Sequence, residues 1–184
     1  MNIFFIHGFR ANHELPLWFT WLSKELQAQG MKTIAPDFPS PHKPQMHEWV
    51  ETIFSHLPKD EFSETIFVAH SLGGAAILRA LEQDNFVQAA HVYLVGVPVD
   101  NVEKQAIANF FEKPFEFEKI RARSKKWTCI YSKNDPHVPF EHGLTYEKAL
   151  GAELMPFEDR GHFEMRTFPE LLTHLTHLYA KKIP

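Results

Sequence analysis

The sequence predicts an α/β fold in which helices cover both faces of a mainly parallel six-stranded sheet. Short apolar runs alternate with longer segments of helical period along the whole chain. The apolar runs are nearly continuous, as in strands that are buried on both faces of a parallel sheet. The 184 residues, 44% of them hydrophobic, suffice for one core, so we expect a single domain over residues 1–184.

Six short apolar runs are the expected strands. Most are rich in β-branched or aromatic residues, and turn-forming or polar residues bound them. In chain order they are residues 2–6, 32–35, 65–69, 91–97, 127–131 and 153–157. The carboxyl ends of parallel strands meet at one edge of a sheet, so loops that follow these strands can combine into one site.

The segments between the strands are expected to form helices, because their apolar residues recur at helical spacing. The expected helices are residues 15–28, 45–55, 72–83, 140–150 and 169–181. Pro36, Pro39, Pro41 and Pro44 interrupt the chain after the second strand, and proline disfavours a helix both at its own position and at the preceding one. We expect an ordered loop there. The one long connection, residues 98–126, leaves no room for a second domain.

Composition and charge exclude several classes of function. The 19 basic residues against 23 acidic ones give a net charge of -4 and form no run that would neutralise a row of phosphates, so we expect no nucleic-acid ligand. No apolar stretch approaches the roughly 18 residues of a membrane-spanning helix, and no secretion signal is visible. The single cysteine, Cys129, cannot form an internal disulfide. We therefore expect a soluble, cytoplasmic protein.

The strongest chemical signal lies in residues 65–76, which combine an apolar run, a turn and a helix that opens with small residues. Ala69 and Gly73 lie two residues before and two residues after Ser71. A serine hydroxyl is a weak nucleophile unless a tight strand-to-helix turn holds it exposed and aimed at a base. Ser71 is therefore the candidate nucleophile. The alternative is that Ser71 only caps the helix.

A serine nucleophile requires a base, and the base requires an acid that orients it. Asp135 follows the fifth predicted strand and His162 follows the sixth, so both are expected at the edge of the sheet that carries Ser71. Their chain order matches that of hydrolases built on such a sheet. Asp159 and Asp100 are lower-ranked alternatives for the acid. The alternative role of Asp135 is to form a turn, and that of His162 is to bond to backbone in a loop.

The oxyanion of a tetrahedral intermediate requires two backbone donors. One is the N–H of Leu72, the residue after the nucleophile. The other is expected from Phe9, because Gly8 lets the chain turn after the first strand. His7 is expected to brace this loop and not to accept protons. The residues expected to contact the substrate are Phe9, Arg10 and Phe38.

No cluster of residues predicts a metal site or a cofactor. His174 and His177 share one face of the last helix, but they lack a third ligand at a familiar spacing, so we expect that face to be solvated. We expect no cofactor and no metal. Four aromatic residues in the long connection either cap an acyl pocket or pack in the core: Phe110, Phe111, Phe115 and Phe117.

Several motifs, spread over nearly the whole chain, occur in the order of a known superfamily. They are FIHG at 5–8, PDFPSP at 36–41 with Trp49 beyond it, AHSLG at 69–73, NDPHVPF at 134–140 and GHF at 161–163. The chain resembles the α/β-hydrolase superfamily, and within it the small serine hydrolases of the YdeN and retinoblastoma-binding-protein type. The resemblance implies a compact α/β-hydrolase fold without a large lid. It also implies a serine esterase of small acyl esters that forms an acyl-enzyme, with Ser71, His162 and Asp135 as nucleophile, base and acid.

The resemblance does not extend to every property of those proteins. Binding of retinoblastoma protein is associated with a Leu-x-Cys-x-Glu motif, and the residues around Cys129 include neither the leucine nor the glutamate. We therefore do not expect that partner, and nothing in the sequence predicts an oligomeric state. The alternatives to an esterase are a non-catalytic interaction module on the same fold and an amidase or peptidase with the same triad.

Overall fold

The predicted strands form one parallel sheet. A computed structural model describes residues 1–57, 59–86 and 88–180 of the protein. Its strands are β1 (Asn2–Ile6), β2 (Lys32–Ile34), β3 (Thr65–His70), β4 (His91–Val95), β5 (Trp127–Ser132) and β6 (Glu153–Phe157). They lie in the order β2-β1-β3-β4-β5-β6, and each neighbouring pair is parallel. The predicted sheet is confirmed, with strand boundaries that differ by at most two residues.

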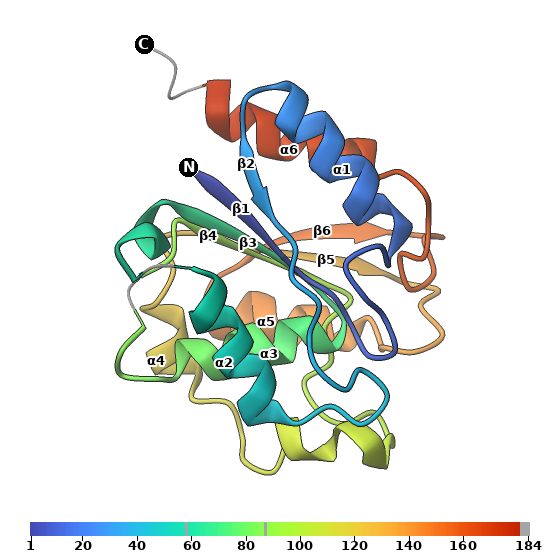
Figure 1. The fold of residues 1–184 in the computed structure, drawn as a ribbon. Helices are drawn as coiled ribbons and strands as arrows, with labels where there is room; N and C mark the ends of the chain where they lie inside the picture. The colour runs from blue at the N-terminus through green and yellow to red at the C-terminus, as the bar shows by residue number, and fades with distance from the viewer. Residues whose placement is uncertain (58, 87, 181–184) are drawn as a thin grey trace.

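Helices cover both faces of the sheet, as predicted (Figure 1). One face carries α1 (Leu17–Ala28) and α6 (Pro169–Ala180). The other carries α2 (Met46–His56), α3 (Leu72–Leu81), α4 (Phe117–Arg121) and α5 (Glu141–Leu150). The expected end of the last helix, at Lys181, lies outside the described residues.

Three short helical segments were not expected from the sequence. They are the 3-10 segments η1 (Lys59–Glu64) and η2 (Gln105–Phe110), and the helix α4. Each has only five or six residues, too few for an apolar period to become visible. The segments η2 and α4 lie in the long connection after β4, and their residues Ile107, Phe110 and Ile120 are buried in the same apolar cluster as α3.

The position of β1 inside the sheet determines where a ligand can bind. The chain adds β2 on one side of β1 and then returns to add β3 on the other side. At such a reversal, the loops that leave the two strands diverge and open a crevice beyond the carboxyl ends. Gly8 lies two residues beyond β1, and Ser71 directly follows β3, so the candidate nucleophile lies at this crevice.

The phenylalanines of the long connection belong to the core. Phe110 and Phe115 are buried, and Phe111 and Phe117 pack against the same cluster from its edge. None of the four is among the described residues that line the cavity at Ser71. Core packing is thus the alternative that the structure supports, and no cap over the site is formed by these rings.

Arg79 on α3 fastens the long connection to the sheet. Its guanidinium donates to the carbonyl oxygens of Phe110, at 2.9 Å, and of Lys113. It also pairs with Glu82 at 2.8 Å and lies 4.2 Å from the ring centroid of Phe115. Because the guanidinium is buried, removing its partner would leave an uncompensated charge, which typically costs about 3–5 kcal/mol. The connection is therefore held in one position.

His174 corrects one expectation about the last helix. His177 is exposed, as expected for a solvated face, whereas His174 is partly buried. The Nδ1 atom of His174 lies 2.9 Å from the hydroxyl of Tyr93, and its Nε2 atom lies 3.5 Å from the carboxylate of Glu153. Sequence spacing identified the shared face but not its contact with β4.

Within the described residues, no helix is long and apolar enough to cross a membrane.

His91, at the start of β4, is a buried histidine far along the sheet from Ser71. Its Nε2 atom lies 2.8 Å from the hydroxyl of Thr128, and its ring stacks on Tyr93 with 4.2 Å between centroids. Burial lowers the pKa of His91 from 6.5 to about 3, and the nearby His174 and Lys126 add to the effect. The folded protein therefore holds this ring neutral, whereas the unfolded chain binds a proton near the ordinary pKa.

We expect the free energy of unfolding to fall as pH decreases from 6.5 towards 3, because the unfolded state then binds the additional proton. Each such histidine contributes a slope that approaches about 1.4 kcal/mol per pH unit. His91→Phe keeps the aromatic stack and removes the proton site, so its stability should depend less steeply on pH. Urea unfolding at several pH values measures this slope, and the exposed His47→Phe is the matched control. An unchanged slope in His91→Phe would contradict the assignment.

Candidate active site

Ser71 occupies the turn between β3 and α3 in an unusual backbone conformation. Its φ of 54° and ψ of -126° lie where side chains other than glycine are rare, and such strain is typical of functional turns. The backbone N–H of Ser71 donates to the carbonyl of Val95 at 2.9 Å, and its carbonyl accepts from the N–H of Gly74 at 2.9 Å. The turn is therefore fixed from both sides, as predicted for a strand-to-helix elbow.

Two glycines let the neighbouring backbones approach this turn. A Cβ atom on Gly73 would lie 2.4 Å from the carbonyl oxygen of Ile6 and 2.5 Å from that of His7. A Cβ atom on Gly8 would lie 2.9 Å from the Cβ of Ser71. Since backbone atoms cannot move aside as a flexible side chain can, α3 packs directly on the end of β1 only because these positions are glycine.

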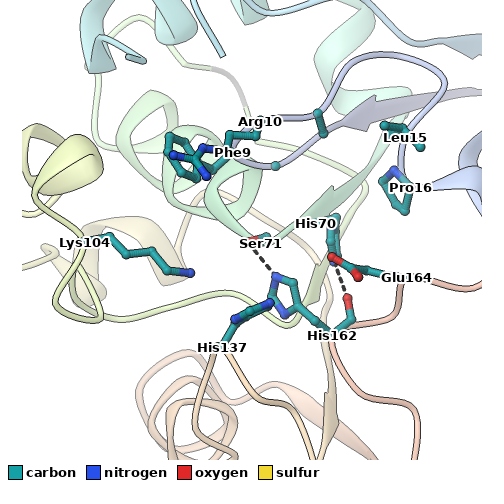
Figure 2. Close-up of a pocket in the computed structure, with 12 residues that line it drawn as sticks. Phe9, Arg10, Leu15, Pro16, His70, Ser71, Lys104, His137, His162 and Glu164 are labelled. Carbon is teal, nitrogen blue, oxygen red and sulfur yellow. Dashed lines mark hydrogen bonds between the residues drawn. The ribbon is translucent and has the colours of Figure 1, made fainter. Parts of the chain in front are cut away.

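The side chains of Ser71, His162 and Asp135 form one chain of hydrogen bonds. The hydroxyl oxygen of Ser71 lies 2.9 Å from Nε2 of His162, and Nδ1 of His162 lies 2.7 Å from Oδ2 of Asp135. Figure 2 shows the first of these contacts at the mouth of a pocket. The three residues come from the loops after β3, β6 and β5. The structure thus brings together the three residues that the sequence analysis selected.

The alternative acids are placed elsewhere. Asp100 accepts a hydrogen bond from the backbone N–H of Val102 and lies 3.8 Å from Nε2 of His142. Asp159 is exposed in the loop after β6. Asp135, and neither of these, provides the carboxylate at Nδ1 of His162.

The carboxylate of Asp135 is held in a charged state. Its Oδ1 atom accepts the backbone N–H groups of His137, at 2.8 Å, and Val138, at 3.0 Å. Burial alone would raise the pKa of Asp135, but the hydrogen bond with His162 and these two N–H donors outweigh it and lower the pKa. A charged carboxylate can only accept, so the proton of His162 lies on Nδ1. Its Nε2 atom can then accept the proton of Ser71.

A polar tie between two loops holds the acid beside the histidine. The side-chain oxygen of Asn134 accepts hydrogen bonds from the hydroxyl of Ser132 and the N–H of Gly161, both at 2.8 Å. The hydroxyl oxygen of Ser132 accepts the N–H of Arg160, also at 2.8 Å. The sequence analysis missed this role of Asn134, although its place directly before Asp135 was a usable signal.

Two buried rings donate hydrogen bonds to the backbone of the loop that carries His162. The Nε2–H of His70 donates to the carbonyl of His162 at 2.8 Å, and the indole N–H of Trp18 donates to the carbonyl of Phe163 at 2.9 Å. Burial, together with the adjacent His162, lowers the pKa of His70 to about 3, so this ring stays neutral. The sequence analysis overlooked His70, which directly precedes the serine in the quoted motif.

His7 braces the loop after β1, as predicted. Its Nδ1–H donates to the carbonyl of Gly8 at 3.0 Å, and its Nε2 accepts the N–H of Phe38 at 3.0 Å. Burial lowers the pKa of His7 below its ordinary value, which keeps the ring neutral. The loop after β1 is in this way joined to the proline loop after β2.

A cavity of about 550 Å³ opens onto Ser71 and His162, a size typical of small-molecule sites. Phe9 and Arg10 line it, in agreement with their predicted contact with a ligand. The prediction for Phe38 is wrong: its ring is buried under the proline loop, 5.1 Å from the ring of His7, and does not line the cavity. The apolar ring of Phe38 packs inward against the core, and the sequence pattern did not show in which direction the ring would point.

The two residues whose N–H groups are the expected oxyanion donors, Leu72 and Phe9, adjoin Ser71 and Gly8. Leu72 is the first residue of α3, so its N–H has no acceptor within the helix, and the helix dipole favours negative charge there. Phe9 follows Gly8, which lies against Ser71 on the other side. No group of three or more His, Cys, Asp or Glu side chains in the described part of the chain is placed to hold a metal ion.

A parallel sheet whose strand order reverses at β1, beside a strained serine elbow after β3, is the framework of the α/β hydrolases, and this chain has that fold. A family model described as serine hydrolase matches residues 3–174. The chain belongs to this serine hydrolase family and is an enzyme.

Individual relatives agree with this assignment. YdeN of Bacillus subtilis (strain 168) is 33% identical over 169 residues, which are 88% of this chain and 85% of the relative. The serine hydrolase RBBP9 of Rattus norvegicus is 30% identical over 158 residues, 84% of this chain and 82% of the relative. The crystal structure of the ydeN gene product from B. subtilis matches with a TM-score of 0.90 and 29% identity, covering 97% of this chain and 98% of that one. The resemblance stated from the motifs is confirmed.

Proposed function

We propose that the enzyme is an esterase of small acyl esters in which Ser71 is the nucleophile, His162 the base and Asp135 the acid. The observation that carries this proposal is the chain of hydrogen bonds from Asp135 through His162 to Ser71, with contacts of 2.7 and 2.9 Å. The serine end of the chain opens into the cavity, where a small ester can reach it. No cofactor takes part in the proposed reaction.

The proposed reaction proceeds in two halves. In the first half, Nε2 of His162 takes the hydroxyl proton as Ser71 attacks the ester carbonyl, and the N–H groups of Phe9 and Leu72 stabilise the oxyanion. His162 then gives the proton to the departing alcohol, which leaves an acyl group on Ser71. In the second half, water attacks this acyl-enzyme and the free acid departs. Asp135 remains charged throughout and stabilises the imidazolium.

The two alternatives are less well supported by the site. A non-catalytic interaction module would not require a serine in a strained backbone conformation with its hydroxyl facing a correctly oriented histidine. An amidase or peptidase would use the same side chains, so only its substrates distinguish it from an esterase. The rates of hydrolysis of acyl esters and of aminoacyl amides are therefore to be compared. We expect the esters to react and the amides to react far more slowly.

A fluorophosphonate probe tests the proposal directly, because it labels serines that an adjacent base activates. We expect one label per chain, mapped by peptide analysis to Ser71, and a labelling rate that rises with pH as the base loses its proton. Heat-denatured protein and Ser71→Ala are the controls. Absence of a label on the folded protein, or a label on another residue, would contradict the proposal.

The proposed setting is the cytoplasm, with a small ester as partner. Cys129 is a free, buried cysteine, and burial raises the pKa of its thiol, so it remains an unreactive part of the core. A chain with such a cysteine suits a reducing compartment.

A further inference from the structure

Charged side chains lie around the cavity in an uneven arrangement. Lys104 and Arg10 line one side of Ser71, and Glu164 lines the other side, near His70 (Figure 2). Figure 2 also shows the ammonium end of Lys104 pointing into the cavity towards Ser71 and His162. The cavity thus has a positive side and a negative side, in a chain whose net charge is -4.

Lys104 has no ionic partner among the residues that the structure describes. It is half-buried. The other half-buried lysine among those with a described side chain is Lys119, which pairs with Asp84 at 2.7 Å. An ammonium group that is partly removed from water gains from an anionic partner. For Lys104 the space open to such a partner is the cavity itself.

The backbone holds Lys104 in place. Its N–H donates to the carbonyl of Asn101 at 2.7 Å, and its carbonyl accepts the N–H of Ile107 at 3.2 Å in η2. The far end of η2 is fastened by Arg79, which binds the carbonyl of Phe110. The backbone of this lysine is thus part of the ordered connection, and its side chain lines the cavity from that fixed position.

Arg10 adds a second positive charge to the same side. Its guanidinium lies 5.0 Å from the ring centroid of Phe9 and forms no ion pair with any described residue. Contact with an aromatic face keeps a guanidinium near that ring while its N–H donors remain available. Across the cavity, Leu15 and Pro16 provide an apolar wall beside Glu164, whose negative charge disfavours an anion there.

We propose that the preferred substrates of this hydrolase are esters that carry a carboxylate a few carbons from the scissile carbonyl, and that Lys104, assisted by Arg10, binds that carboxylate. The proposal rests on the proposed esterase function and specifies its substrate class. The uncharged part of the ester would lie against Leu15 and Pro16. Lys104 is then the principal residue that determines specificity.

Matched pairs of esters test the preference. Monomethyl glutarate against methyl pentanoate places the carboxylate on the acyl part, and the acetate ester of 4-hydroxybutanoate against butyl acetate places it on the alcohol part. We expect kcat/KM to be about tenfold higher for the charged member of one pair, the usual effect of one charge-assisted contact. The preference should weaken as salt increases. Equal or lower kcat/KM for the charged member in both pairs would overturn the proposal.

Variants assign the preference to Lys104. In Lys104→Met the ratio of charged to uncharged kcat/KM should fall close to one, and in Lys104→Arg it should be largely kept. Lys125→Met is the matched control, because it removes the same charge from an exposed position just before β5, at the opposite edge of the sheet. A full preference that persists in Lys104→Met would overturn the assignment.

Failure of this inference can be told apart from failure of the esterase proposal. If the fluorophosphonate labels Ser71 and both members of each pair are hydrolysed at similar rates, only the preference for a carboxylate is wrong. If no label forms and no ester of either kind is hydrolysed, the esterase proposal itself is wrong.

Discussion

Ser71→Ala is expected to lower kcat on small esters by about a millionfold, the effect of removing a serine nucleophile where chemistry limits turnover. The hydroxyl that is lost is the one that contacts Nε2 of His162, at 2.9 Å. The turn itself should survive, because its bonds to Val95 and Gly74 are made by backbone atoms. The variant should therefore unfold at nearly the same temperature as the natural protein.

Steady-state kinetics together with thermal unfolding check this prediction. The control is Ser55→Ala, which removes an exposed hydroxyl from α2 whose partners are the carbonyl of Thr52 and Nδ1 of His56. Its kcat should be unchanged. Esterase activity that survives in folded Ser71→Ala would show that another residue is the nucleophile.

Asp135→Asn is expected to lower kcat by about ten thousandfold with little change in KM, as a wrong histidine tautomer does in serine hydrolases. The N–H groups of His137 and Val138 point at Oδ1, so the amide oxygen of the new asparagine would take that position. Its NH2 group would then face Nδ1 of His162, which must become an acceptor. The proton of the ring moves to Nε2, which can no longer accept the proton of Ser71.

The pair of variants Asp100→Asn and Asp159→Asn provides matched controls for this test. Both carboxylates are exposed, and it is Asp135 that is hydrogen-bonded to His162, so both variants should retain nearly full kcat. A large loss in either of them, with Asp135→Asn still active, would reassign the acid. Esterase assays of Asp135→Asn at several pH values test the same point. A neutral His162 ring with its proton on Nε2 keeps that proton when the pH is raised moderately, so the lost kcat should not return.

The sequence predicted those parts of the site that depend on local order along the chain. Ser71, Asp135 and His162 each follow a strand of a parallel sheet, and that topology alone brings them to one edge. Phe38 was misplaced because the direction of its ring depends on the packing of Trp49 and His7, which no local pattern encodes.

Residues whose roles arise only in the folded chain could not be found in the same way. Lys104 reaches the cavity because the long connection folds back over α3, where Arg79 holds it. Glu164 and His70 lie beside predicted residues in the sequence, yet only the coordinates show what they face. The partly buried ring of His174 is a further case, because its contact with Tyr93 joins residues 81 positions apart.

The hydrogen bond from Trp18 to the carbonyl of Phe163 joins residues 145 positions apart, next to the proposed base. During synthesis on the ribosome, the nucleophile and its elbow emerge long before the loop that carries His162. Hydrolytic competence can arise only after the C-terminal quarter has docked on the first helix. A nascent or C-terminally shortened chain would therefore present its serine without the proposed base.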